Sequence, residues 1–264
     1  MARTLDDYAH AYETIHLERE DGILLMELHS GDGPLMWGDL VHRELIHALH
    51  DISTDPETHV MIFTGRGDVF LNDIDRSTWG SDPDDKDVRE RMFHECKLLL
   101  RGFLDIPVPV IGAINGPARL HAELPLLSDI VIAADTTVFQ DSAHFYTGGV
   151  PGDGVNVLWP MWLGPNRGRH FLLTGQEIYA EEALRLGLVG EVLAPDQLMG
   201  RAWEIAREFT RRPRISLRAT RLALTLGLRR AINADLDEGL ALEFLSRAWV
   251  RMPYPYVTRD EARA

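Results

Sequence analysis

The chain has 264 residues, 45% of them hydrophobic, which is enough apolar material for a buried core and argues against a disordered protein. Its 27 basic and 41 acidic residues give a formal net charge of −14. This acidity disfavours nucleic acids and anionic membrane surfaces as partners. Cys96 is the only cysteine, so an intrachain disulfide and a zinc site built on several cysteines are both excluded.

The N-terminal sequence is charged and lacks the apolar stretch of a secretory signal. No apolar run reaches the length that a membrane-spanning helix needs. We therefore expect a cytoplasmic protein that does not bind membranes.

The first part of the chain alternates strand and helix signals. The patterns predict a hairpin at 14–19 and 23–28, a helix at 40–52, a buried strand at 60–63, a polar loop at 80–87 and the end of a helix at 98–104. They continue with a strand at 108–114, a short helix at 124–127 and a strand at 130–133. Strands separated by helices imply crossover connections and a largely parallel sheet, so we expect an α/β fold.

From about Pro195 onward the pattern becomes helical. We expect three helices, at 198–210, 215–228 and 232–250, followed by an extended tail at 252–264. These helices have apolar stripes that must pack on the core or on a neighbouring subunit.

The first candidate site residue is His121, which follows the turn Asn115-Gly116-Pro117 after a predicted strand. Open α/β sheets bind ligands where strands pass into helices. An imidazole there can donate a hydrogen bond to a carbonyl oxygen as it becomes an oxyanion. The alternative is a surface histidine on a loop.

The second candidate is His144, which a glycine-rich loop separates from Asp153. A histidine oriented by a carboxylate can take a proton from water near neutral pH, because the acid fixes the tautomer and stabilises the imidazolium. Asp153 has an equally good alternative role as the cap of a helix beginning near Val155.

Two further candidates are Trp37 and Glu243. Trp37 precedes a predicted helix, and its indole can serve as a rigid hydrogen-bond donor or as a pocket wall, although most tryptophans pack in the core. Glu243 lies between apolar residues on the last predicted helix. It belongs either to the solvated face of that helix or beside the site.

Other chemistries have no motif support. The sequence contains neither a glycine-rich dinucleotide or phosphate-binding motif nor a serine-esterase elbow. His47 and His50 share a helix face without carboxylate support, which makes a poor metal site. We expect no cofactor and no metal.

Nearly the whole chain resembles the crotonase (enoyl-CoA hydratase/isomerase) superfamily. The strongest matches are PVPVIGAING (107–116), SDIVIAA (128–134), VPGDG (150–154) and LTG (173–175). The resemblance implies a crotonase (ClpP/crotonase-like) spiral of ββα units in residues 1–194. It also implies that residues 195–264 form a C-terminal helical trimerisation region, in a homotrimer or a hexamer made of two trimers.

The chain departs from the CoA-using members at three places, the first of which is Leu35-Met36-Trp37-Gly38 in place of an Asn-Ala-Leu-type segment. Where those members have a glycine triplet after the Asn-Gly turn, this chain has Arg119-Leu120-His121 in a loop one residue shorter. Where hydratases have a Pro-Glu pair, it has Ser142-Ala143-His144. A backbone donor and a catalytic carboxylate are thus replaced by imidazoles.

The same substitutions resemble the β-diketone hydrolases related to 6-oxocamphor hydrolase, which perform retro-Claisen cleavage. This resemblance implies catalytic roles for His144, Asp153, His121 and Glu243 and a substrate-binding role for Trp37. We add Trp79 and Phe145 as expected pocket residues.

The expected reaction partners are a small cyclic diketone and water. Two alternatives remain open: an enzyme acting on an acyl-CoA thioester, and a non-catalytic oligomeric scaffold.

Overall fold

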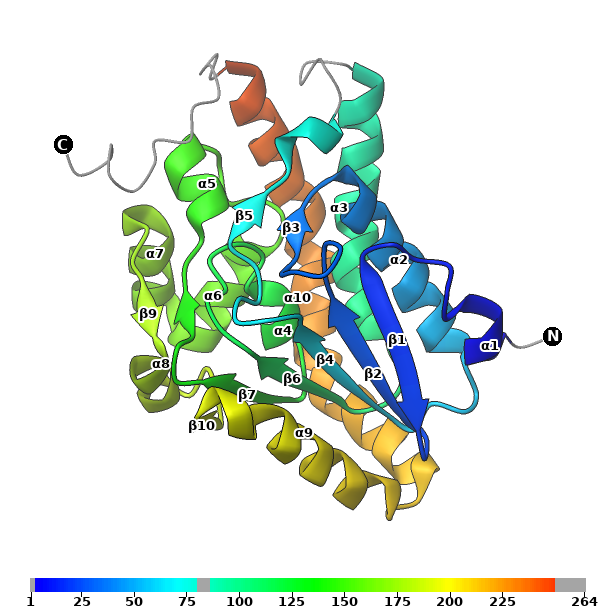
Figure 1. Ribbon diagram of the computed structural model, residues 1–264. Helices are drawn as coiled ribbons and strands as arrows, with labels where there is room; N and C mark the ends of the chain where they lie inside the picture. The colour runs from blue at the N-terminus through cyan, green and yellow to red at the C-terminus, as the bar shows by residue number, and fades with distance from the viewer. Residues whose placement is uncertain (1–2, 80–85, 250–264) are drawn as a thin grey trace.

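The central sheet begins with the predicted hairpin (Figure 1). The computed structural model describes residues 3–79 and 86–249. Strand β1 (Ile15–Glu20) pairs antiparallel with β2 (Ile23–Leu28). The connecting residues Asp21 and Gly22 have positive φ values of 50° and 80°, a conformation that glycine adopts without steric penalty. The hairpin prediction is confirmed.

The rest of the sheet is parallel. Its six strands have the order β1-β2-β4-β6-β7-β10, and β2, β4, β6, β7 and β10 all run in the same direction. The four strands added after the hairpin are β4 (Val60–Gly65), β6 (Val110–Ile114), β7 (Ile130–Ala134) and β10 (Glu191–Leu193). The predicted α/β architecture with a largely parallel sheet is therefore confirmed. Parallel strands end at one common edge, and the chain leaves β6 at that edge toward His121.

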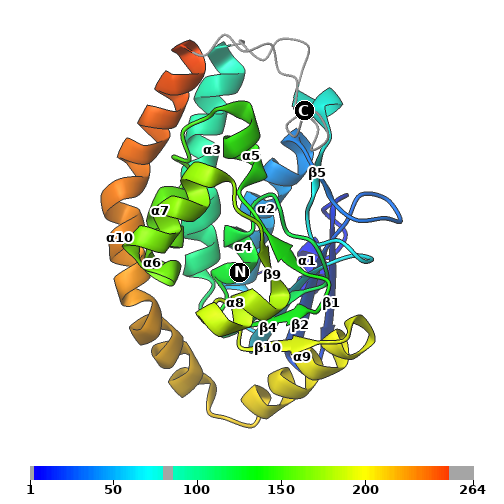
Figure 2. The ribbon, with the colours of Figure 1, turned by 90° about the vertical axis from the view of Figure 1, so that its left-hand side faces the viewer.

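Helices cover both faces of the sheet (Figures 1 and 2). Alternate residues of β4 point to opposite sides: Met61 and Phe63 join the core shared with α2 (Asp39–Thr54) and α3 (Lys86–Asp105). Val60 and Ile62 join a second apolar cluster with α9 (Pro195–Thr210). A strand buried on both faces carries apolar residues without interruption, which is the pattern of β4.

The last helix differs from the prediction. Residues expected to form two helices, 215–228 and 232–250, form one continuous helix, α10 (Arg214–Trp249), which packs against α3 and α6 (Val155–Leu163). Figure 2 shows α10 along the side of the molecule. The expected break at 229–231 is Arg-Arg-Ala, three strong helix formers without a proline, so nothing ends the helix there.

Short elements connect the sheet and the long helices. They are α1 (Leu5–Tyr8), β3 (Met36–Trp37), β5 (Asp73–Ile74), η1 (Arg76–Trp79), α4 (Glu123–Leu126), β8 (Val138–Phe139), α5 (Ser142–Thr147), α7 (Pro165–Thr174), β9 (Ile178–Tyr179) and α8 (Ala180–Leu186). Of these, β3, α4 and α5 carry or flank the candidate site residues.

Part of the predicted loop at 80–87 and all of the predicted tail at 252–264 lie outside the described residues, whereas Lys86 and Asp87 begin α3. Among the described helices, none is both long and apolar enough to cross a membrane.

Candidate active site

His144 lies on α5 with an aspartate beside its ring. Asp141 precedes α5 at the N-cap position, three residues before His144, so one helical turn brings the two side chains together. His144 Nδ1 lies 2.8 and 3.0 Å from the two Asp141 carboxylate oxygens, and both side chains are buried. Nδ1–H donates to Asp141, so Nε2 carries the lone pair of the neutral ring. Asp141 therefore makes the hydrogen bond that orients the His144 ring, and the predicted pairing of His144 with Asp153 stays a prediction.

Asp153 and Glu243 lie on the Nε2 side of the same ring. Nε2 of His144 is 3.7 Å from Asp153 Oδ2 and 3.6 Å from Glu243 Oε1. Two glycines allow this approach, because a Cβ on Gly152 or Gly239 would collide with the backbone of the other. Their contact brings the loop that carries Asp153 onto α10. Glu243, one turn beyond Gly239 on that helix, thereby reaches the histidine.

Asp153 does not cap the helix that follows it. α6 has Gly154 at its N-cap, with φ at 108°, and no side-chain hydrogen bond caps the helix. Asp153 Oδ1 and Glu243 Oε2 are buried and have no hydrogen-bond partner among residues 3–79 and 86–249. Glu243 Oε1 accepts a hydrogen bond of 2.5 Å from Arg247. Because buried polar atoms normally have partners, the two free oxygens are suited to a substrate or a water molecule.

His121 adopts an unusual backbone conformation before α4. Its φ is 44°, and within the described chain Asp21 is the only other non-glycine residue with a positive φ. Such strain persists where surrounding contacts enforce it, and it often occurs at functional sites. One contact is with Glu123, whose Oε1 lies 2.7 Å from His121 Nδ1. The other is with Trp37, whose ring lies 4.0 Å from the imidazole, centroid to centroid, at an interplanar angle of 36°.

Both histidines meet at Asp153. One side-chain nitrogen or oxygen atom from each of His144, Asp153 and Glu243 lies within 4.8 Å of the other two. The same holds for His121, Glu123 and Asp153. The structure therefore brings together four of the predicted site residues around a single carboxyl group. Such nitrogen and oxygen donors have the composition of a divalent-cation site, and they also serve acid–base chemistry without a metal.

Burial and neighbouring charges set the protonation of the His144 cluster. Burial lowers the pKa of His144, but the Asp141 and Asp153 carboxylates outweigh this effect, and the pKa lies well above its ordinary value. Burial raises the pKa of Asp153 to about 7, although the His144 charge opposes the rise. Burial also acts on Glu243, but His144 and Arg247 outweigh it and lower the pKa. Glu243 is thus the ionised carboxylate, whereas Asp153 takes up a proton as the pH falls through about 7.

The pKa of His121 also depends on burial and on a neighbouring carboxylate. Burial lowers this pKa, but the charge and hydrogen bond of Glu123 raise it above its ordinary value. An imidazolium has an N–H at both ring nitrogens. With Nδ1–H donated to Glu123, the Nε2–H of His121 is available to a substrate oxygen.

Trp37 is buried, and side chains from α2 and α3 support it from behind. The ring of His42 meets the indole edge-on, 5.7 Å away at 87°. His42 Nδ1 lies 3.1 Å from Glu95 Oε2, and its Nε2 lies 3.7 Å from Cys96 Sγ. Trp37 is therefore held between His121 on one side and the His42–Glu95 pair on the other.

The structure adds less information about the two predicted pocket residues, Phe145 and Trp79. Phe145 is 40% exposed, and its ring packs on Gly175 and lies 5.3 Å from the ring of Tyr146. Trp79 ends η1, but its side chain lies outside the described residues. A substrate-binding role for either residue stays a prediction.

Sequence reasoning missed Asp141 and Glu123, the carboxylates that hold the two imidazoles. For Asp141 the available signal was its position three residues before His144 at a helix start. Glu123 stands two residues after His121 in a short helix. Its side chain is buried, so it is not a solvent-exposed acid.

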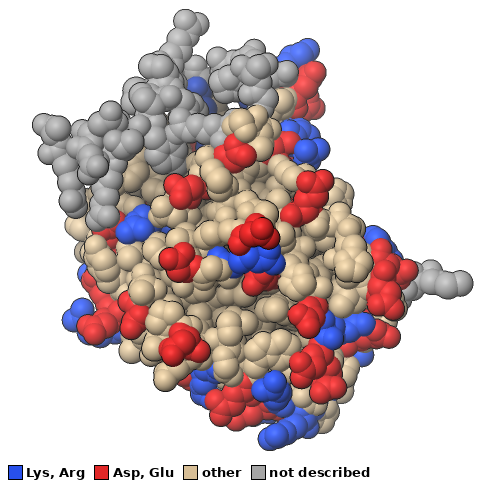
Figure 3. All heavy atoms as spheres, in the orientation of Figure 1, with Lys and Arg blue, Asp and Glu red and all other residues tan. Residues whose placement is uncertain are grey.

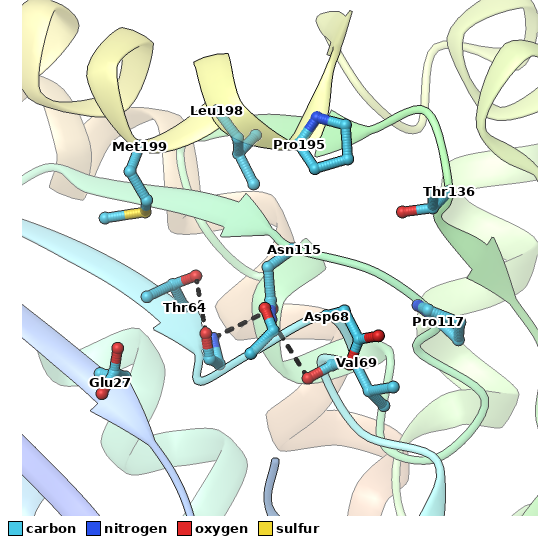
Figure 4. Close-up of a pocket in the computed structure, with 12 residues that line it drawn as sticks. Glu27, Thr64, Asp68, Val69, Asn115, Pro117, Thr136, Pro195, Leu198 and Met199 are labelled. Atoms are coloured by element: carbon cyan, nitrogen blue, oxygen red, sulfur yellow. Dashed lines mark hydrogen bonds between the residues drawn. The ribbon is translucent and has the colours of Figure 1, made fainter. Parts of the chain in front are cut away.

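A separate hollow of about 520 Å³ lies at the carboxyl ends of β2, β4 and β6, against α9. Figure 4 shows Leu198 and Met199 above it and Asn115 at its centre. The Asn115 side chain bonds to Gly65 N and to the carbonyl oxygens of Gly67 and Val69. Asn115 therefore ties two loops together.

Comparison with known proteins places this chain in a family. Residues 18–245 match the profile of the enoyl-CoA hydratase/isomerase family. The 1,2-epoxyphenylacetyl-CoA isomerase of Escherichia coli is 29% identical over 224 residues, which cover 83% of this chain and 84% of that protein. A putative enoyl-CoA hydratase of Thermus thermophilus is 30% identical over 218 residues, covering 78% of this chain and 80% of that protein.

Solved structures agree on the fold. A beta-diketone hydrolase from the cyanobacterium Anabaena sp. PCC 7120, bound to (S)-3-oxocyclohexyl acetic acid, is 43% identical, with a TM-score of 0.90 over 93% of this chain and 98% of that chain. An enoyl-CoA hydratase/isomerase from Mycobacterium paratuberculosis is 27% identical, with a TM-score of 0.82 over 95% of this chain and 96% of that chain.

The α/β fold and the family match define an enzyme of the crotonase superfamily. The chain belongs to the enoyl-CoA hydratase/isomerase family and has the crotonase fold that its sequence predicts.

Proposed function

We propose that this enzyme hydrolyses a carbon–carbon bond of a β-diketone by a retro-Claisen reaction, without coenzyme A. The observation that carries the proposal is the convergence of the His121 and His144 imidazoles on the Asp153 carboxyl. The similar Anabaena structure is named a beta-diketone hydrolase and holds a keto acid. Opening of a bicyclic 1,3-diketone by water leaves a keto acid of this kind.

His144 acts as the general base. Its Nε2 takes a proton from water, while Asp141 holds the opposite nitrogen and stabilises the imidazolium that forms. The water oxygen then attacks one carbonyl carbon of the diketone. A positioned base contributes roughly 10²–10⁴-fold in rate.

His121 and Trp37 bind a substrate carbonyl oxygen. The Nε2–H of the His121 imidazolium and the indole N–H of Trp37 donate hydrogen bonds to it and stabilise the negative charge that develops. Their stacked rings fix both donors before the substrate arrives. When the tetrahedral intermediate collapses, the departing carbon becomes an enolate, which the second carbonyl stabilises. Protonation of that carbon gives the keto acid.

A second candidate function is hydration or isomerisation of an enoyl-CoA thioester, because curated relatives at 29% and 30% identity have names of this kind. Against it, the loop after β6 carries His121 where the CoA-using members have glycines, and α5 carries His144 where hydratases have a Pro-Glu pair. A non-catalytic scaffold would need His121 and His144 in different environments. Their common neighbour Asp153 argues against that alternative.

The assembly that fits this proposal is a homotrimer or a dimer of trimers in the cytoplasm. α10 exposes a set of large apolar side chains, namely Leu222, Leu224, Leu226, Leu242 and Leu245. Burial of such residues between subunits is the usual way to remove them from water. By contrast, the face drawn in Figure 3 carries acidic and basic side chains side by side.

A substrate panel tests the proposed function. Mono- and bicyclic 1,3-diketones are incubated with the purified enzyme, and loss of diketone and formation of keto acid are followed by NMR. The proposal expects catalytic turnover of at least one cyclic diketone and no saturable binding of crotonyl-CoA. Micromolar binding and hydration of crotonyl-CoA, with every diketone unchanged, would favour the second candidate function instead.

A further inference from the structure

We propose that Asp153 is the acid that protonates the departing carbon and that His144 returns a proton to it, so that one carboxyl group relays the proton taken from water. This inference rests on the proposed hydrolysis and assigns its last chemical step. It also gives Asp153 a task different from the orienting role that the sequence suggests.

The position of Asp153 between two imidazoles supports the relay. One carboxyl oxygen, Oδ2, lies 3.7 Å from His144 Nε2, the nitrogen that takes the proton from water. The other oxygen, Oδ1, is buried without a hydrogen-bond partner in the described part of the chain. One ring nitrogen of His121, the proposed donor to the substrate oxygen, lies within 4.8 Å of an oxygen of the same carboxyl group. Asp153 thus has one oxygen near the base and a second oxygen without a partner in the described part of the chain, and the inference assigns this second oxygen to the substrate.

Asp141 leaves Asp153 free for this task. A carboxylate that orients a histidine must keep its hydrogen bond to the ring throughout the reaction. In this site Asp141 makes that bond to His144 Nδ1 at 2.8 Å. Asp153 therefore has no orienting contact to lose when it gives up a proton.

The other nearby carboxylates are less suited to carry a proton. Glu243 accepts a hydrogen bond from Arg247, and the charges of His144 and Arg247 outweigh burial and lower its pKa. Glu123 is bonded to His121 Nδ1. Burial raises the pKa of Asp153 to about 7, which lets this group hold a proton near neutral pH.

The proton and electron movements balance. Water gives a proton to His144 Nε2 and its oxygen to the carbonyl carbon. The carbon–carbon bond then breaks, and its electron pair leaves with the departing carbon as the enolate. The protonated Asp153 carboxyl donates its proton to that carbon, and the His144 imidazolium returns one to Asp153. The sum is one diketone plus one water giving one keto acid, with both side chains restored.

The test uses the face on which the new C–H bond forms. The substrate is a bicyclic 1,3-diketone whose bridgehead carbon lies between the carbonyls. That carbon cannot enolise, so it takes up deuterium only after cleavage. In D₂O the wild-type enzyme is expected to place deuterium at one of the two diastereotopic positions of the new methylene group, as NMR of promptly quenched product would show.

Asp153→Asn keeps the shape of the side chain but removes its proton transfer. Residual product from this variant is expected to carry deuterium equally at both positions, because water then quenches the enolate. Asp141→Asn is the matched control: it slows the reaction but keeps the label at one position. Asp153→Glu serves as a second variant and is expected to retain part of the selectivity.

Wild-type selectivity in Asp153→Asn would overturn the inference. So would loss of all product from both folded Asp153 variants, since a released enolate reacts with water. If the wild-type enzyme cleaves no diketone, the proposed function fails, and that result is distinct from a cleavage whose label is unaffected by Asp153.

Discussion

The two histidines of the site differ in what surrounds them. His144 has three carboxylates as neighbours, Asp141 on Nδ1 and Asp153 and Glu243 near Nε2. His121 has Glu123 on Nδ1 and the indole of Trp37 against its ring. Thus His144 lies among carboxylates, which accept protons, whereas His121 lies against the aromatic ring of Trp37.

In the proposed mechanism, this difference suits the two rings to opposite tasks. A base must take a proton, and the carboxylates around His144 stabilise the charge that it gains. An oxyanion donor must keep its proton, and His121 has one carboxylate to hold its charge and a free Nε2–H to donate. Changes at each ring test whether the tasks are as separate as the geometry indicates.

The largest expected effect comes from His144→Ala, which removes the base. We expect kcat on a cyclic diketone to fall roughly 1,000-fold, because a positioned base contributes on the order of 10²–10⁴-fold. Steady-state kinetics on protein with an unchanged circular dichroism spectrum would measure it. Activity within a few fold of wild type would exclude His144 as the base.

His121→Ala is expected to have the next largest effect. It removes one donor to the developing negative charge, which costs about 100-fold in kcat in comparable sites. KM is expected to change less than kcat, because the donor interacts most strongly with the charged intermediate. A large rise in KM at constant kcat would instead assign His121 to ground-state binding.

The pH dependence separates the two rings. His144 works as the neutral base, so the rate falls at pH values below its raised pKa. His121 works as the imidazolium, so the rate falls at pH values above its own raised pKa. Each limb is expected to change the rate about tenfold per pH unit. Deprotonation of Asp153, the proposed acid, adds to the alkaline limb. His121→Gln should therefore change the alkaline limb and keep the acid limb, and an unaltered profile in this variant would contradict the assignment.

The smallest expected effect concerns the support of Trp37. His42→Phe keeps a ring against the indole but loses the bond to Glu95, so we expect kcat to fall roughly threefold to tenfold from a small displacement of the donors. His47→Phe is the matched control, because His47 lies on the same helix and is exposed. Equal kinetics for the two variants would remove His42 from the positioning of Trp37.

Local patterns were enough to predict most of the fold. The hairpin, the α2 helix and the buried strands follow from apolar spacing and turn residues. The continuity of α10 was missed because the polar residues at 229–231 interrupt the apolar pattern. The helix continues through them, packed against α3 and α6. Local helix propensity at 229–231 and packing against α3 and α6 together explain the length of the element.

The site could be predicted only in part. The resemblance pointed to His121, His144, Asp153 and Glu243, and the structure brings their side chains together. The spacing of Asp141 from His144 was a usable signal, whereas Glu123 is one of 41 acidic residues and its sequence position does not rank it above the others. The bond from His42 to Glu95 joins residues 53 positions apart, a distance over which local patterns carry no information.

The most direct test of water-dependent carbon–carbon cleavage is a single-turnover reaction in oxygen-18-labelled water with a bicyclic 1,3-diketone. Mass spectrometry of the quenched product should find a keto acid with one labelled oxygen in its new carboxylate, and His144→Ala should give almost none. Recovery of unchanged diketone from the wild-type enzyme, under conditions in which it hydrates crotonyl-CoA, would contradict the account.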